Sequence, residues 1–193
     1  MYGYRVVIAD SDVKSAKETA ALLTRAGQIV VGQAHDGMTA LRLIRNTLPD
    51  LVLLDVGIQG MTALDLVNNI DGGKLLPVIL TGDFHLRDEL STFNNMWIFG
   101  FLFKPVTEVN LLPTMQLAVH NFQRQNEMAK EIEELKNTLQ VRKVVDKAKG
   151  ILMKTAGLTE EAAFRKIQKQ SMDKGKPMKV VAEAIILAHE LSY

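Results

Sequence analysis

Short apolar runs alternate with longer amphipathic stretches over roughly the first 120 residues. Five runs rich in β-branched and aromatic side chains predict strands. They span residues 5–9, 29–34, 51–54, 77–81 and 100–103. The stretches between them, such as 13–26 and 37–48, space their apolar residues as amphipathic helices do. This alternation predicts an α/β fold: a doubly wound, five-stranded parallel sheet covered by helices on both faces.

A different pattern follows Pro105. We expect Pro113 to lie in the first turn of a long helix that ends at Gly157. Apolar residues spaced four, three and four apart predict a coiled-coil seam within this helix. They are Met128, Ile132, Leu135 and Leu139. The alternative is a single amphipathic helix that packs against its own domain.

Two shorter helices are predicted beyond Gly157. Thr159 and the two acids after it are typical of a helix start, and that helix runs to about Asp173. Apolar residues from Met178 onward recur with helical spacing and predict a third helix. We therefore expect three regions: an α/β domain at 1–122, a coiled-coil stem at 123–141 and a small three-helix domain at 142–193.

Composition narrows the classes of function. The chain has 193 residues and no cysteine, which excludes disulfides and thiolate metal sites. No run approaches the roughly 18 to 20 apolar residues of a membrane span, and the start of the chain lacks the pattern of a signal peptide, so we expect a cytoplasmic protein with no membrane partner. Residues 1–140 carry 12 basic and 16 acidic side chains, whereas residues 141–193 carry 11 basic and 6 acidic ones. The basic end predicts a polyanionic partner.

Polar side chains follow four of the predicted strands. Asp10 and Asp12 come after the first strand, Asp55 after the third, Thr81 ends the fourth and Lys104 follows the fifth. Any one of them alone is more typical of a turn or a helix cap. The carboxyl ends of parallel strands, however, meet at one edge of a sheet, where ligands bind. Carboxylates, a hydroxyl and an ammonium together favour phosphoryl transfer to an aspartate, with Mg²⁺ held by the acids.

With these motifs, residues 5–122 resemble the flavodoxin-like receiver domain of bacterial response regulators. The resemblance rests on Asp10 and Asp12, on the run Leu51 to Asp55, on Thr81 and on the run Phe101 to Pro105. It implies that Asp55 is the phosphoacceptor, that Thr81 and Lys104 bind the phosphoryl group, and that Thr81 and Phe101 form the switch pair. It also implies a sensor histidine kinase as partner and no catalytic activity other than self-phosphorylation from a phosphodonor.

The implied metal site departs from the receiver pattern at one position. Its ligands would be Asp10, Asp12, Asp55 and the backbone carbonyl of Gly57. Receivers of this type usually carry two adjacent acids after the first strand, but the second position here is Ser11. A neutral hydroxyl is a weaker ligand than a carboxylate for a hard cation, so this change predicts weaker binding of Mg²⁺.

The last third of the chain resembles a second family. The runs Val144 to Met153, Gly157 to Phe164 and Val181 to Ile185 are similar to the ANTAR domain. This resemblance implies a dimer that binds paired RNA hairpins and prevents transcription termination, and the domain order resembles ethanolamine-utilisation regulators. Six basic residues are the candidates for RNA contact. They are Lys147, Lys149, Lys154, Arg165, Lys166 and Lys169.

We therefore predict a two-component response regulator that is phosphorylated on Asp55, dimerises through its stem and acts as an RNA-binding antiterminator. Two alternatives remain at this stage. The last two helices could form a helix-turn-helix that binds duplex DNA. The substitution at Ser11 favours a third class, a scaffold that binds partners without being phosphorylated.

Overall fold

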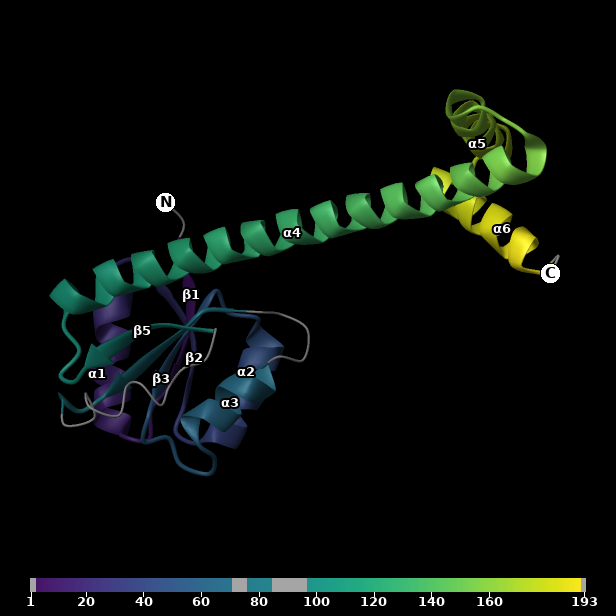
Figure 1. Ribbon diagram of the computed structural model, residues 1–193. Helices are drawn as coiled ribbons and strands as arrows, with labels where there is room; N and C mark the ends of the chain where they lie inside the picture. Colours follow the sequence, from purple (N-terminus) through teal and green to yellow (C-terminus); the bar gives the residue numbers. More distant parts are fainter. Residues whose placement is uncertain (1–2, 71–75, 85–96, 192–193) are drawn as a thin grey trace. The chain divides into compact units, whose positions relative to one another are not determined.

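The computed structural model describes residues 3–70, 76–84 and 97–191 (Figure 1). The chain divides into two compact units, residues 1–126 and residues 127–193. Within the described residues, no helix is both long and apolar enough to cross a membrane.

The first unit contains the predicted five-stranded parallel sheet. Its strands are β1 (Arg5–Ala9), β2 (Ile29–Ala34), β3 (Leu51–Asp55), β4 (Val78–Gly82) and β5 (Ile98–Phe103). They lie in the order β2-β1-β3-β4-β5, and all neighbouring pairs are parallel. The predicted fold class and the positions of the strands are confirmed to within two residues at each end.

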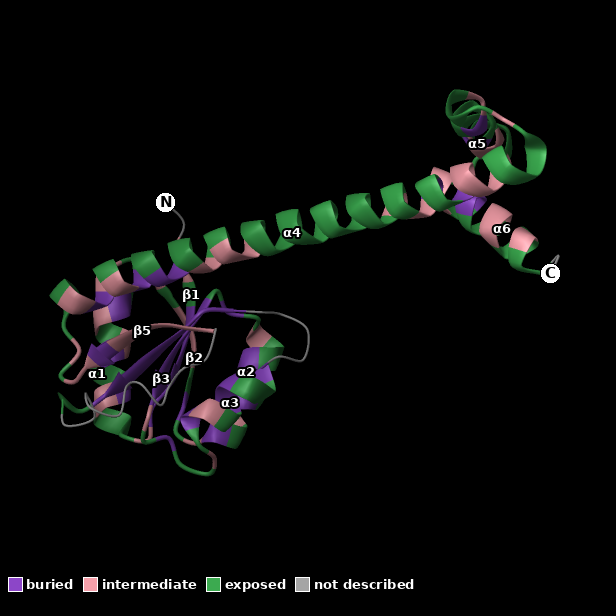
Figure 2. Cartoon of the chain, in the orientation of Figure 1, coloured by how far each residue is buried: buried purple, intermediate pink, exposed green. Residues whose placement is uncertain are grey.

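Helices cover both faces of this sheet (Figure 2). The first unit holds α1 (Val13–Arg25), α2 (Gly37–Thr47), α3 (Ala63–Ile70) and the beginning of α4 (Glu108–Ala156). Val7 and Ala9 of β1 pack in one core with α2 and α3, while Val6 and Ile8 pack in the other core with α1 and α4. Successive side chains of a strand point to opposite faces, so a strand buried on both sides is continuously apolar.

Helix α4 begins earlier than the sequence predicts. It starts at Glu108, so Pro113 lies inside the helix and not in its first turn. A proline there has no N–H to donate to the carbonyl of Val109. Val109, the residue whose carbonyl lacks this donor, is itself 86% exposed. The prediction for Pro113 was wrong because the helix is capped one turn earlier, where the side chain of Asn110 accepts a hydrogen bond from Thr107 N at 2.9 Å.

The second unit consists of the rest of α4 with α5 (Glu160–Lys174) and α6 (Met178–Glu190). Its small core draws one or two buried side chains from each helix. They are Val145, Ala148, Ile167, Val181 and Ala182. As predicted, Gly157 follows the end of α4, with φ of 63°, and the Thr159 side chain accepts a hydrogen bond from Ala162 N at the start of α5. The three-helix arrangement is confirmed.

Candidate functional site at the carboxyl edge of the sheet

Four predicted site residues meet where the central strands end. Asp55 is the last residue of β3 and pairs in register with Thr81 of β4. Asp10 directly follows β1, and Lys104 directly follows β5. Asp10, Asp55 and Thr81 are each less than a tenth exposed, although residues of these types usually lie at the surface. Burying polar groups costs free energy, so this edge of the sheet is built around them.

The ammonium of Lys104 joins the two carboxylates. Its Nζ lies 2.7 Å from Oδ1 of Asp55 and 2.9 Å from Oδ2 of Asp10. The peptide bond that follows, between Lys104 and Pro105, is cis. Two negative charges and one positive charge in a half-buried site leave one carboxylate charge uncompensated, which favours a cationic or electrophilic ligand.

Burial and charge shift the ionisation of this group of side chains. Burial raises the pKa of Asp55 and outweighs the opposing effect of Lys104, and the negative charge of Asp10 raises that pKa further. For Lys104, burial lowers the pKa, but hydrogen bonds to Asp55 and Asp10 more than offset this, so the pKa of Lys104 is raised. Perturbed pKa values of this kind gather at functional sites.

The loop after β1 separates the two residues that follow Asp10. The carboxylate of Asp12 caps α1 by accepting a hydrogen bond from Lys14 N at 2.8 Å. The hydroxyl of Ser11 donates to the carbonyl of Gly57 at 3.3 Å and accepts from Gln59 N at 2.9 Å. Ser11 therefore ties the loop after β3 to the loop after β1, while Asp12 stabilises a helix.

The oxygen atoms at this edge fit a magnesium ion. Mg²⁺ is usually held by one or two carboxylates, with water and phosphate oxygens completing its shell. Asp10 and Asp55 supply two carboxylates, and Gly57 supplies a carbonyl next to Ser11. Among the described residues, no group of three or more acids or histidines could hold a metal, so Asp12 does not join Asp10 and Asp55 in such a group.

Two contacts around Asp10 were missed by sequence reasoning. The hydroxyl of Ser15 donates to Oδ2 of Asp10 at 2.7 Å. The Nδ1 atom of His35 lies 2.8 Å from the carbonyl oxygen of Asp10. A carbonyl only accepts, so this nitrogen carries the proton. Ser15 lies in the first turn of a predicted helix and His35 just beyond a predicted strand, so neither position stood out in the sequence.

The predicted switch residues occupy neighbouring strands. Thr81 is buried on β4, and Phe101 is partly buried on β5 and pairs in register with Leu80. The ring of Phe101 also lies 5.0 Å from the ring of Phe103. Phe101 packs against the core formed by β1, α2 and α3. Its packing agrees with a structural role and leaves the switch role a proposal.

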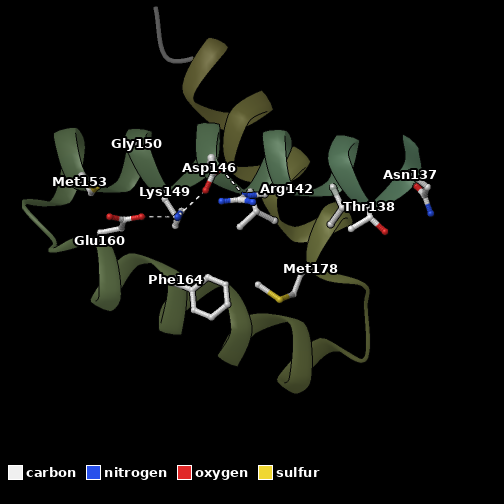
Figure 3. A pocket seen from close by; sticks show the side chains of 12 residues that line it. Asn137, Thr138, Arg142, Asp146, Lys149, Gly150, Met153, Glu160, Phe164 and Met178 are labelled. Carbon is white, nitrogen blue, oxygen red and sulfur yellow. Dashed lines mark hydrogen bonds and ion pairs between the residues drawn. The ribbon is translucent and has the colours of Figure 1, made fainter. Parts of the chain in front are cut away.

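The six predicted RNA contacts fall into two groups in the second unit. Lys147 pairs with Glu190, and Arg165 pairs with Glu161. The ammonium of Lys149 lies 2.7 Å from Asp146 and 2.8 Å from Glu160, and its side chain is only 14% exposed (Figure 3). The hydrogen bond to Asp146 and, to a smaller extent, the hydrogen bond to Glu160 raise the pKa of Lys149.

The other three cations are Lys154, Lys166 and Lys169. All three are exposed, and within the described parts of the chain none of them pairs with an acid. Glu160 and Glu190, which pair with Lys149 and Lys147, lie on different helices from these lysines. The spacing of residues in the sequence therefore gave no sign of which basic residues are paired.

Two protein families match parts of the sequence. The response regulator receiver domain matches residues 6–116, and the ANTAR domain matches residues 133–186. The transcriptional regulatory protein PdtaR of Mycobacterium tuberculosis is 32% identical over 182 residues, which cover 94% of this chain and 89% of that protein. The nitrate regulatory protein of Klebsiella oxytoca is 33% identical over 81 residues, 42% of this chain and 20% of that protein.

Solved structures share the fold of the first unit. The receiver domain of the response regulator NarL from Mycobacterium tuberculosis superposes with a TM-score of 0.53 at 26% identity, over 62% of this chain and 98% of that one. The receiver domain of a diguanylate cyclase from Desulfovibrio desulfuricans gives a TM-score of 0.58 at 22% identity, over 64% and 98% of the two chains.

Proposed function

Because the chain belongs to the response-regulator family and joins a receiver domain to an ANTAR domain, we propose that it is an RNA-binding transcription antiterminator controlled by phosphorylation of Asp55. The observation that carries the first half is the contact of Lys104 with both Asp55 and Asp10 at the end of the sheet. A sensor histidine kinase would supply the phosphoryl group, and the protein would act in the cytoplasm.

In the proposed reaction, a carboxylate oxygen of Asp55 attacks the phosphorus of a phosphohistidine. The bond from phosphorus to the histidine nitrogen breaks as the bond to the aspartate forms, and the nitrogen leaves with its electron pair. Magnesium, when bound, neutralises charge on the phosphoryl oxygens. Asp10, Asp55 and the carbonyl of Gly57 would hold that ion.

Lys104 has two successive roles in this proposal. Before transfer, its ammonium pairs with Asp55 at 2.7 Å, which orients the carboxylate and favours its ionised form. Once Asp55 is phosphorylated, the negative charge lies on the phosphoryl oxygens, and the ammonium of Lys104 would pair with them. Thr81 lies on the adjacent strand, in register with Asp55, and its hydroxyl would donate a hydrogen bond to a phosphoryl oxygen.

The second unit would bind RNA through its unpaired cations. Lys154, Lys166 and Lys169 have no acidic partner among the described residues, so they are available to phosphates. Lys149 pairs with Glu160 and so joins α4 to α5, which leaves its ammonium less available to phosphates. We therefore propose that the first three bind RNA and that Lys149 acts as a structural residue.

Two copies of the chain would join through the stem. Met128, Ile132, Leu135 and Leu139 are 47–58% exposed and lie along one face of α4. A dimer presents two RNA-binding units, so binding of the second hairpin becomes intramolecular and gains roughly 10²-fold in effective affinity.

A gel-shift titration with three nucleic acids tests this function. We expect the full chain to bind a transcript with two closely spaced hairpins much more tightly than the same transcript with one hairpin deleted, and duplex DNA least of all. Equal affinity for duplex DNA would favour a helix-turn-helix regulator instead. RNA binding that does not change when Asp55 is phosphorylated would favour the scaffold class that Ser11 suggests.

A further inference from the structure

The stem of α4 has no packing partner within the described part of the chain. Every residue from 127 to 140 is exposed, including the four apolar residues of the seam. An isolated helix gains little stability in water, because most helical stability in proteins comes from packing an apolar face. The seam therefore needs a cover, and the proposed function supplies one in the form of a second copy.

The same helix face continues beyond Leu139 with charged residues. Steps of three, four and three lead to Arg142, Asp146 and Lys149, so these residues follow the seam in unbroken heptad register. The side chain of Arg142 is 80% exposed and that of Asp146 is 52% exposed. Their own contact, from Nε to Oδ2, is long at 3.9 Å. Oδ1 of Asp146 contacts Lys149 at 2.7 Å, whereas its Oδ2 and the Arg142 guanidinium are open to a further partner.

A groove lies along this stretch of α4. It has a volume of about 720 Å³, and α4 forms one wall from Asn137 to Met153. Figure 3 shows Phe164 of α5 and Met178 facing Arg142 across it. The ring of Phe164 is 40% exposed at this wall. The ion pair between Lys149 and Glu160 connects the two walls at the level of Lys149.

We propose that α4 of a second copy lies in this groove and that Arg142 of each copy pairs with Asp146 of the other. The inference rests on the proposed stem dimer and extends its interface by one heptad. In a parallel two-stranded coiled coil, Arg142 and Asp146 occupy consecutive core positions, so each arginine lies beside the aspartate of the other copy. The two-fold axis makes this contact occur twice.

This charged heptad would set the orientation and register of the dimer. A parallel, in-register pair places two positive and two negative charges in adjacent layers. An antiparallel pair that covers residues 128–146 would instead place Asp146 opposite Met128, where it keeps only the contacts with Lys149 and Arg142 of its own copy. A charge that faces an apolar residue in a helix interface costs free energy, so the parallel arrangement is favoured. The apolar seam alone would not make this distinction.

Charge reversal in the full chain tests the pairing between copies. Arg142→Glu places four acids in the heptad of the homodimer, and Asp146→Lys places four basic residues there. We expect each homodimer to weaken by roughly tenfold or more in Kd, since each reversal replaces two attractive pairs with repulsive ones. The control is Lys130→Glu, which makes the same change of charge as Arg142→Glu at an exposed position on the opposite side of α4.

The decisive sample is a mixture of the two variants carrying different tags. In the mixed dimer, the introduced glutamate of one copy meets the introduced lysine of the other, and the remaining Arg142 meets the remaining Asp146. Within each copy the pair stays broken. We expect heterodimers to dominate, and native mass spectrometry would count them. A statistical mixture of weak dimers, or single variants that dimerise like the unaltered chain, would overturn the inference.

Disulfide crosslinking separates this inference from the proposed dimer itself. The chain has no cysteine, so single variants report one position each. We expect both Leu135→Cys and Arg142→Cys to form disulfide-linked dimers. Crosslinking at 135 but not at 142 would support the stem dimer but refute the inference that α4 of a second copy lies in the groove. No crosslinking at either position would refute both. Protection of Arg142→Cys from alkylation by hairpin RNA, without crosslinking, would identify RNA as the occupant and overturn the inference.

Discussion

The division of the basic residues into paired and unpaired groups makes a quantitative prediction for RNA binding. Replacing Lys154, Lys166 and Lys169 together with glutamine removes three exposed cations that have no acidic partner among the described residues. If each neutralises one phosphate, each contributes roughly 0.9 to the slope of log K against log salt concentration on helical nucleic acid. The triple variant should therefore lose about 2.7 from this slope for each copy bound, or about 5.4 for a dimer on two hairpins.

For each copy, that slope corresponds to a loss of affinity of roughly 10²-fold at about 0.15 M salt, and the two losses multiply in a dimer on two hairpins. The assay is a gel-shift titration of the two-hairpin transcript at several salt concentrations. A matched control replaces Lys130 and Lys136, exposed cations of the stem, with glutamine and should change the slope little. If the control lowers the slope by as much per lysine as the triple variant does, general charge attracts the RNA and the reasoning from unpaired cations is refuted.

Three further predictions concern the receiver and the stem. Ser11→Asp should raise both the affinity for Mg²⁺ and the rate of phosphorylation by acetyl phosphate, because another carboxylate strengthens a hard-cation site; unchanged values would refute this. The raised pKa of Lys104 means that its stabilising effect is fully present below pH 10.5 and is lost as the pH rises through the folded-state pKa. As the pH rises above 10.5, the free energy of unfolding should therefore fall less in Lys104→Met than in the unaltered chain. An identical pH profile for the two proteins would contradict the ion pairs. Replacing Ile132 and Leu135 together with lysine should give monomers by sedimentation, and a surviving dimer would move the interface elsewhere.

Much of the receiver site could be predicted because its residues directly follow or end strands that the sequence pattern reveals. Asp55 and Thr81 each end a continuously apolar run, and parallel pairing places the ends of such runs at one edge of the sheet. Lys104 follows the last strand for the same reason. The pattern therefore indicated both the elements and the residues that they bring together.

Contacts that depend on the angle of a side chain could not be predicted in the same way. Asp12 and Asp10 are only two residues apart, yet one caps α1 and the other contacts Lys104. Lys149 and Lys154 are both lysines of α4, but only the first faces α5 and finds Glu160. Such choices are set by tertiary packing, which leaves no signature in the spacing of residues along one helix.

The most direct test of the central claim is the intact mass of the full chain after incubation with acetyl phosphate and Mg²⁺. The account predicts one added phosphoryl group on the unaltered protein, none on Asp55→Asn, and a gain in affinity for the two-hairpin transcript in the phosphorylated sample alone. A phosphoryl group that persists in Asp55→Asn, or an unmodified chain that binds the transcript as tightly as the phosphorylated one, would contradict it.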